Sequence, residues 1–434
     1  MSIFEPALIP ILVVAALAAS NCALVGSYLV LRRMSLLGDA ISHGVLPGLV
    51  IGFLLSGSRD LAPMFIGALI AAVITALGAE LLKRRLRIDG DAAMGVVFTT
   101  LFAAGVLLIH RYAGQVDLDP GCVLYGQAEY AALDLWRGSI FGWHPPRTAI
   151  SLLAVAFVNL AVVTLFWKEF LIASFDSSLA DSLGFRAMGV HLLLMALTAL
   201  TTVAAFEAVG SILVVAMLVV PGAVGVLLSD RLIGVLIAAQ GAALASAVGG
   251  VWGAQRWDTS VAGMMGVSAG VVFAVAFLLA PRHGWLPRRA RRWALSLRIA
   301  EEDLLGAMYR DRESKHTRGE RIPIAPALAG HPGWLCLLAR LRCRWSGEVR
   351  SIDGELALSD EGLTRGRRIV RRHRLWELYL SDRLSIPDSH LHDPAHRIEH
   401  FLDEDLTRRL EEKLDRPDRD PHGREIPPSG EASA

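Results

Sequence analysis

Two ionisable residues stand four positions apart in a strongly apolar part of the chain. The stretch "LRRMSLLGDAISHGVLPG", residues 31–48, places Asp39 and His43 between two long hydrophobic runs. On a helix, residues i and i+4 share a face, and a carboxylate beside an imidazole suits manganese, iron or zinc. The alternative is that Asp39 caps a helix N-terminus and His43 is a packed polar residue. This stretch alone does not decide between the two.

A second group of metal-binding residue types lies near the other end of the chain, where six of the thirteen histidines fall between residues 373 and 422. Imidazoles that converge with carboxylates make transition-metal sites. For any one histidine, a charged helix face in water is the simpler interpretation, but two such helices together favour a metal site. The residues at helical spacing are His373 and Glu377 in one segment, and His396, Glu399 and His400, with His392 just before them, in the other.

The distribution of charge divides the chain into two parts. Residues 1–280 contain 14 Lys and Arg and 16 Asp and Glu, whereas the remaining 154 residues contain 29 and 26. The first part is typical of a membrane protein and the second of a soluble, charged domain. The four cysteines form no CxxC pair, and we expect them to be reduced or inert.

The apolar part predicts an all-α polytopic membrane domain, because only helices satisfy their own backbone groups in lipid. A span needs about 20 predominantly apolar residues. Nine segments meet this requirement: 8–31, 37–55, 62–82, 93–110, 148–167, 188–205, 208–228, 232–255 and 260–280.

Basic residues in the short loops predict the orientation of these spans. With the N-terminus outside, most of the basic residues fall inside, including the cluster at 282–292. This arrangement places the C-terminal domain in the cytoplasm. It also places Asp39 and His43 near the cytoplasmic end of the second span, where an ionisable residue usually faces the bundle interior or a water-filled path.

Four stretches of the apolar part, residues 24–55, 91–109, 166–185 and 208–232, resemble the permeases of bacterial metal ABC importers, the zinc/manganese/iron family. The resemblance runs across about residues 7–285 in the family's order. It implies the helical membrane subunit of a type II ABC importer in the bacterial cytoplasmic membrane. The pair in "GDAISH", Asp39 and His43, stands where the family places metal-contacting residues in its conduit.

The same resemblance implies the partners of the chain. These are a homodimeric or sister permease, a separate ABC ATPase subunit, and an extracytoplasmic metal-binding protein. The segment "FDSSLADSLGF", residues 175–185, resembles the part of the permease that docks on the ATPase. The chain contains no GxxxxGK[ST] phosphate loop, so we expect a transporter subunit and not an enzyme.

The charged part begins after a basic juxtamembrane linker, residues 286–298, that we expect to touch acidic lipid headgroups. Residues 300–310 predict a short amphipathic helix, and Asp353-Gly354 between two alternating segments predicts a hairpin. Residues 359–384 predict one long helix and 391–414 another, with Asp393 as its N-cap. Together these elements indicate a winged-helix unit with a helical dimerisation unit.

The segments "HRLWELYLSDRL", "LHDPAHRIEH" and "DPHGREIP" resemble the metal-dependent repressors of the diphtheria-toxin-repressor and manganese-repressor family, over about residues 299–427. Residues 1–285 are then the permease domain, and residues 428–434 a disordered tail. By position, the resemblance implies two metal sites. One comprises His373, Glu377 and His392, and the second comprises His396, Glu399 and His400. Asp303 stands where the family's first helix supplies another ligand.

The segment where this family reads DNA departs from its pattern. Residues 330–349, "GHPGWLCLLARLRCRWSGEV", have a Pro-Gly pair and little of the polar character needed to read base edges. We therefore predict a permease for manganese, iron or zinc whose cytoplasmic domain senses the same metal. The alternative is a membrane-tethered, metal-dependent transcription regulator that binds DNA.

Overall fold

The computed structural model describes residues 8–57, 61–112, 126, 128–133, 135–136, 144–175, 177–185, 187–318, 330–352, 355–384, 386–387 and 390–428. The chain divides into two compact units, Met1–Pro287 and Arg288–Ala434. Each unit is described by itself. The expected disordered tail lies almost entirely outside the described residues.

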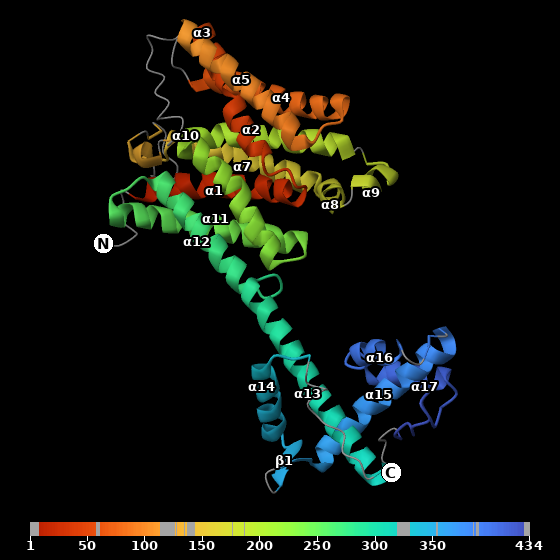
Figure 1. Ribbon diagram of the computed structural model, residues 1–434. Helices are drawn as coiled ribbons and strands as arrows, with labels where there is room; N and C mark the ends of the chain where they lie inside the picture. The colour runs from red at the N-terminus through yellow and green to blue at the C-terminus, as the bar shows by residue number, and fades with distance from the viewer. Residues whose placement is uncertain are drawn as a thin grey trace. The chain divides into compact units, whose positions relative to one another are not determined.

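The first unit is built of helices throughout its described residues (Figure 1). Nine segments of the described chain are long and apolar enough to cross a membrane, which confirms the number of spans expected from hydropathy. The elements are α1 (Ile9–Leu31), α2 (Leu37–Gly44), α3 (Leu46–Ser56), α4 (Leu61–Leu86), α5 (Gly90–Tyr112), η1 (Ala128–Ala132), α7 (Arg147–Leu165), α8 (Trp167–Phe175), α9 (Ser177–Ser182), α10 (Ala187–Leu228), α11 (Leu232–Trp257) and α12 (Val261–Leu279).

Two spans are interrupted in ways that follow from their residues. The second span consists of α2 and α3, which meet at Val45; Pro47 stands in the first turn of α3, where its missing N–H has no partner to lose. Helix α10 contains the sixth and seventh spans, Met188–Phe206 and Ala208–Leu228, and it is kinked at Gly210, near the start of the seventh, where φ is 77° and ψ is 162°. Glycine adopts such a backbone without the Cβ clash of other residues.

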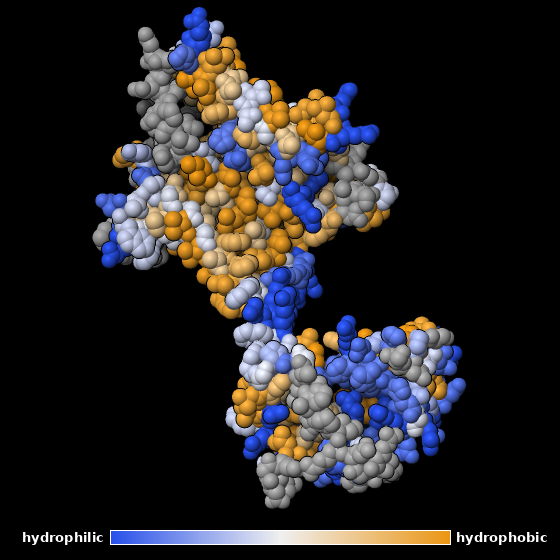
Figure 2. All heavy atoms as spheres, in the orientation of Figure 1, coloured by the Kyte–Doolittle hydropathy of each residue, from blue (hydrophilic) through white to orange (hydrophobic). Residues whose placement is uncertain are grey.

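Helix α1 is the centre of the first unit and packs against α7, α10 and α11 (Figure 1). A Cβ on Gly26 would lie 1.9 Å from the backbone oxygen of Leu218, so α1 and α10 approach closely because this residue is glycine. Buried amides also join the helices: Asn21 donates to the backbone oxygen of Leu152, and Asn159 donates to Asn21 and to Thr201. Large apolar side chains remain exposed on the outside of the unit, as Figure 2 shows, which suits a lipid-facing surface.

The described residues of the second unit form five helices and two strands around small apolar cores. The strands pair antiparallel with Ile352 opposite Glu355, which confirms the hairpin, although Asp353 and Gly354 lie outside the described residues. The elements are α13 (Trp285–Arg318, which begins in the first unit), α14 (Gly333–Trp345), β1 (Val349–Ile352), β2 (Glu355–Leu358), α15 (Asp360–Leu384), α16 (His392–Ile398) and α17 (Glu404–Lys413).

Two expectations about these helices were wrong. The short helix at 300–310 is part of the 34-residue α13, which runs through the predicted linker. The expected helix at 391–414 is two helices, and the N-cap of the first is Leu391, not Asp393. Asp403 explains the break, because its extended backbone and its carboxylate, which accepts from the Leu406 N–H at 2.7 Å, begin a new helix.

Candidate metal centres

The structure places Asp39 and His43 together on α2. His43 Nε2 lies 3.6 Å from Asp39 Oδ1, and the imidazole packs against Phe98 and Phe102 of α5, with ring centroids 5.9 and 5.7 Å away. The N-cap of α2 is Leu36, and Asp39 stands inside the first turn, so the N-cap interpretation of Asp39 was wrong.

Neither member of this pair is in a dry core, because the side chains of His43 and Asp39 are 40% and 41% exposed. A charged or strongly polar group facing hydrocarbon is costly, and such groups normally face a bundle interior or water. Within the described residues, no third His, Cys, Asp or Glu completes a ligand group around the pair. The pair therefore presents one carboxylate and one imidazole on an open face of α2.

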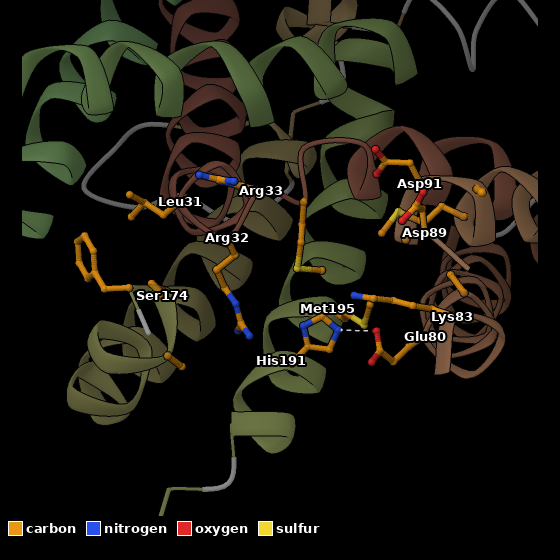
Figure 3. Close-up of a pocket in the computed structure, with 17 residues that line it drawn as sticks. Leu31, Arg32, Arg33, Glu80, Lys83, Asp89, Asp91, Ser174, His191 and Met195 are labelled. Carbon is orange, nitrogen blue, oxygen red and sulfur yellow. Dashed lines mark hydrogen bonds and ion pairs between the residues drawn. The ribbon is translucent and has the colours of Figure 1, made fainter. Parts of the chain in front are cut away.

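A cavity of about 800 Å³ in the same unit is lined by charged residues, and the sequence analysis did not predict its central ion pair (Figure 3). His191 of α10 and Glu80 of α4 face each other with Nε2 and Oε2 3.0 Å apart, and both side chains are nearly buried. Arg84 donates to the other oxygen of Glu80 at 2.7 Å. Arg32, at the end of α1, lines the same cavity. The pair connects α4 to α10 across the helix bundle.

The second unit brings Asp303, His396, Glu399 and His400 into one cluster. His400 Nε2 lies 3.2 Å from Asp303 Oδ1 and 3.7 Å from Glu399 Oε1. His396 Nε2 lies 3.6 Å from Asp303 Oδ1, and His396 Nδ1 lies 3.0 Å from Glu399 Oε1. One ligand atom from each residue lies within 4.8 Å of the others. Two carboxylates and two imidazoles suit a divalent transition metal.

One buried oxygen in this cluster supports that assignment. Asp303 Oδ1 has no hydrogen-bond donor, although the Asp303 side chain is only 1% exposed. Such an atom is normally paired when buried. The nearest imidazole nitrogens, of His396 and His400, approach it without the geometry of a hydrogen bond. A cation bound among these atoms would satisfy the oxygen, so the residues present fit a metal ion.

A second cluster contains His373, Glu377 and His392. His373 Nε2 lies 3.0 Å from Glu377 Oε1 and 3.0 Å from His392 Nδ1, and His392 Nδ1 lies 3.3 Å from Glu377 Oε1. His373 and Glu377 are buried, whereas His392 is exposed and forms the open side of the cluster. The six residues that the sequence assigns to two sites thus form those two groups, and Asp303 joins His396, Glu399 and His400. Their metal binding stays a prediction.

Glu399 connects the two clusters. Its Oε1 faces His396 and His400, while its Oε2 accepts a hydrogen bond from His373 Nδ1 at 2.7 Å. This bond turns His373 Nε2 toward the second cluster, and a hydrogen-bonded partner of this kind fixes the orientation of a metal-ligating imidazole. The two clusters therefore share one buried carboxylate.

The protonation states in these clusters follow from burial and pairing. Burial raises the pKa of Glu399, but hydrogen bonds from His373 and His396 lower it more, to about 2. Burial lowers the pKa of His400, but the neighbouring carboxylates of Asp303 and Glu302 raise it more, to about 9. The carboxylate of Glu399 is thus ionised and the imidazole of His400 is protonated, so a metal ion that binds here would have to displace that proton.

Sequence reasoning missed two residues that contact these clusters. Glu302 accepts from His400 Nδ1 at 2.8 Å, which directs His400 Nε2 toward the cluster. His331 Nε2 lies 2.7 Å from Asp303 Oδ2. Both are in the positions of outer partners that orient metal ligands. The adjacent acids in "EEDLL" were a signal for Glu302, but no local pattern marks His331.

Comparison with known proteins identifies the first unit. Residues 5–280 match the ABC 3 transport family. The chain belongs to this family. Residues 359–428 of this ABC 3 family member match the iron dependent repressor, metal binding and dimerisation domain, which confirms both expected resemblances. The chain is therefore a multi-pass membrane permease with a repressor-like C-terminal domain.

Individual relatives of this permease cover one or both parts. The zinc transport system membrane protein TroD of Treponema pallidum is 40% identical over 66% of this chain and 78% of its own length. The manganese transport system membrane protein MntD of Bacillus subtilis is 41% identical over 62% and 91%. A probable metal transport system membrane protein of Chlamydia trachomatis is 30% identical over 93% and 92%, so it matches both parts.

A solved structure has a similar membrane fold. PsaBC from Streptococcus pneumoniae in complex with Fab matches with a TM-score of 0.56 and 28% identity, over 66% of this chain and 96% of that chain.

Proposed function

We propose that this permease is the membrane subunit of an ATP-driven importer of a divalent transition metal: manganese, zinc or iron. The observation that carries the proposal is the pair Asp39 and His43, half-exposed on one face of α2 inside a span. A carboxylate and an imidazole replace part of the water that a divalent ion loses on entering the membrane. The relatives named for manganese and zinc transport support the same substrate class.

The pair also bears on how the pore is assembled. Two ligands are too few for zinc, which takes four, or for manganese. A polar face of this kind is also costly against lipid. We therefore place this face of α2 on a water-lined path beside a second permease subunit, either a second copy or a sister chain, which supplies further ligands together with water.

The importer needs further subunits besides this permease. Because the chain has no phosphate loop, a separate ATPase supplies the energy, and α9 within residues 175–185 is the segment that docks on it. Metal arrives from an extracytoplasmic binding protein. With the N-terminus outside, nine spans place the second unit in the cytoplasm.

In the cytoplasm, the two clusters of the second unit bind the transported metal and inhibit transport when the cell is replete. Asp303, His396, Glu399 and His400 hold one ion, and His373, Glu377 and His392 hold the other. Metal shifts the transport cycle only if it binds one conformation of this domain more tightly than another. Because the two clusters share the carboxylate of Glu399, metal binding at one cluster changes the metal affinity of the other.

The transport proposal is tested by uptake of radioactive manganese and zinc in cells that express the importer. We expect Asp39→Asn and His43→Gln each to reduce uptake to background, because each removes one metal ligand at nearly constant size. Asp258→Asn and His110→Gln are the matched controls, since both residues are exposed at helix ends away from α2. Normal uptake in both α2 variants would refute the proposed path.

The sensor proposal is tested by preloading the same cells with metal. Wild-type uptake should fall as internal metal rises, and a chain that ends at residue 298 should lose this inhibition. Unchanged inhibition in the shortened chain would contradict the sensor role. The alternative is a membrane-tethered transcription regulator. It predicts that the second unit binds promoter DNA in the presence of metal, and that Asp39→Asn and His43→Gln leave metal uptake by the cells unchanged.

A further inference from the structure

Helix α14 presents a second apolar face that points away from its own domain. Leu335, Ala339 and Cys343 are buried and face the domain core. The side chains on the other face are exposed, from 44% for Leu338 to 97% for Trp345. This face comprises Trp334, Leu337, Leu338, Leu341 and Trp345, which follow the i, i+3, i+4, i+7 spacing of one helix stripe. We call these five residues the α14 outer face. Figure 2 shows hydrophobic side chains on the surface over α14.

The outer face continues onto the neighbouring helix. Trp293 of α13 packs against Trp334 with ring centroids 6.4 Å apart, and the guanidinium of Arg289 lies 5.6 Å from the centroid of the Trp293 ring. Trp293 and Leu295 are themselves exposed. Two helices thus share one aromatic and aliphatic surface, larger than the scattered apolar residues normal on a soluble domain.

The exposed charges on the two helix segments that carry this surface are of one sign. Arg340 and Arg344 flank the outer face on one side and Arg342 on the other, and all three side chains are exposed. Residues 285–300 and 333–345 contain no Asp or Glu. A leucine and tryptophan face bordered by arginines is the pattern of a helix that lies in a membrane interface, and it complements anionic lipid headgroups.

Chain connectivity keeps this surface close to the bilayer. Helix α12 ends at Leu279, and Trp293 follows on α13. Because each residue spans at most about 3.5 Å, Trp293 lies no farther than about 50 Å from the end of the last span. A tethered surface needs little intrinsic affinity, because tethering turns docking into an intramolecular event.

We propose that the α14 outer face docks on the anionic leaflet of the membrane that holds the permease. Helix α14 occupies the segment where related repressors read DNA, and the five residues of its outer face offer no hydrogen-bond groups for base edges apart from the two indole N–H groups. A docked α14 holds the metal clusters at the membrane surface, because Arg342 pairs with Glu301 and Arg298 with Glu302, beside Asp303. The proposal rests on the cytoplasmic placement of this unit.

The test uses the full-length permease in lipid nanodiscs. An environment-sensitive fluorescent amino acid replaces Leu337, and the lipids carry a quencher on their acyl chains. The matched control places the same fluorophore at Arg409 of α17, whose side chain is 73% exposed. We expect strong quenching at position 337 in discs containing anionic lipid, less in neutral discs, and none at position 409 in either.

A second variant tests the electrostatic contribution. Arg340→Ala combined with Arg344→Ala should lower the ratio of docked to undocked domain about 30-fold in anionic discs, because each arginine near an anionic surface contributes about a fivefold change. The metal content of the purified double variant should equal that of wild type, since neither arginine contacts the clusters. Equal quenching in the wild type and the double variant would overturn the electrostatic part of the proposal.

Three results would overturn the docking itself. The first is a fluorophore at position 337 that is exposed to water in both kinds of disc. The second is a fluorophore that is shielded only after the ATPase is added, which indicates a protein partner. The third is shielding that depends on protein concentration and not on lipid charge, which indicates a second copy of the chain. Metal uptake is measured on the same variants. Normal uptake with a water-exposed α14 would refute the docking and leave the transport proposal standing.

Discussion

Replacement of Glu399 by glutamine should weaken both metal clusters at once. Glutamine keeps the size of the side chain but removes its charge and turns one oxygen into an NH₂ group. At one cluster, the oxygen facing His396 and His400 is lost as an anionic ligand or loses its geometry. At the other, the acceptor of the 2.7 Å hydrogen bond from His373 is weakened. One substitution therefore removes a ligand from the cluster with His396 and His400 and an orienting partner from the cluster with His373.

The magnitude follows from these two roles. Loss of an orienting partner weakens metal affinity about 10- to 100-fold, which corresponds to about 1.4–2.8 kcal/mol. The cluster that loses the ligand itself should be weakened at least as much. Titration of the purified full-length permease with Mn²⁺ in a calorimeter should show two binding events in the wild type and two weakened events in Glu399→Gln.

The control for this substitution is Glu404→Gln, five residues farther along the chain. The Glu404 side chain is 79% exposed and pairs only with Arg368 among the described residues. It should bind metal like the wild type. The thermal unfolding midpoint of each metal-free protein separates lost affinity from lost structure. The shared-carboxylate interpretation is refuted if Glu399→Gln weakens one event and leaves the other unchanged.

Three further predictions concern contacts that local sequence does not reveal. His331→Ala removes the imidazole that holds Asp303 and should weaken Mn²⁺ binding about 10-fold, measured by the same titration. Glu80→Ala leaves the nearly buried imidazole on α10 without its partner and should lower unfolding stability by about 3 kcal/mol, measured in detergent; an unchanged unfolding midpoint would contradict the role of this pair. Gly26→Ala drives a Cβ into the α10 backbone and should destabilise the fold by about 1–3 kcal/mol or more, whereas Gly270→Ala, with open space around it, should leave the midpoint unchanged or raise it.

The elements that could be predicted from the sequence are those set by local periodicity. The nine spans follow from runs of apolar residues, and the helix with His373 and Glu377 follows from their i, i+4 spacing. The break between α16 and α17 was missed because the charged residues around Asp403 continue a helical pattern, while the cap that ends it depends on the backbone at that residue.

Contacts between residues far apart in the chain could not be predicted from the spacing of residues within one segment. Asp303 reached the predicted ligand set through a family resemblance, since it lies on α13, far from the histidines of α16 in the sequence. Glu302 and His400 are 98 positions apart, and Glu80 and His191 are 111 apart. Such pairs are set by how helices pack, and a single sequence carries no periodic signal for them.

The position of the metal itself tests the central claim most directly. The permease, assembled with its ATPase and its second permease subunit and supplied with zinc, can be imaged at a resolution that locates ions. Our account predicts an ion between α2 and a water-lined path, with Asp39 and His43 at about 2.0–2.2 Å from it. The opposite result is an assembled complex in which both side chains face lipid or lie in a dry interface away from any path. That result would contradict the account.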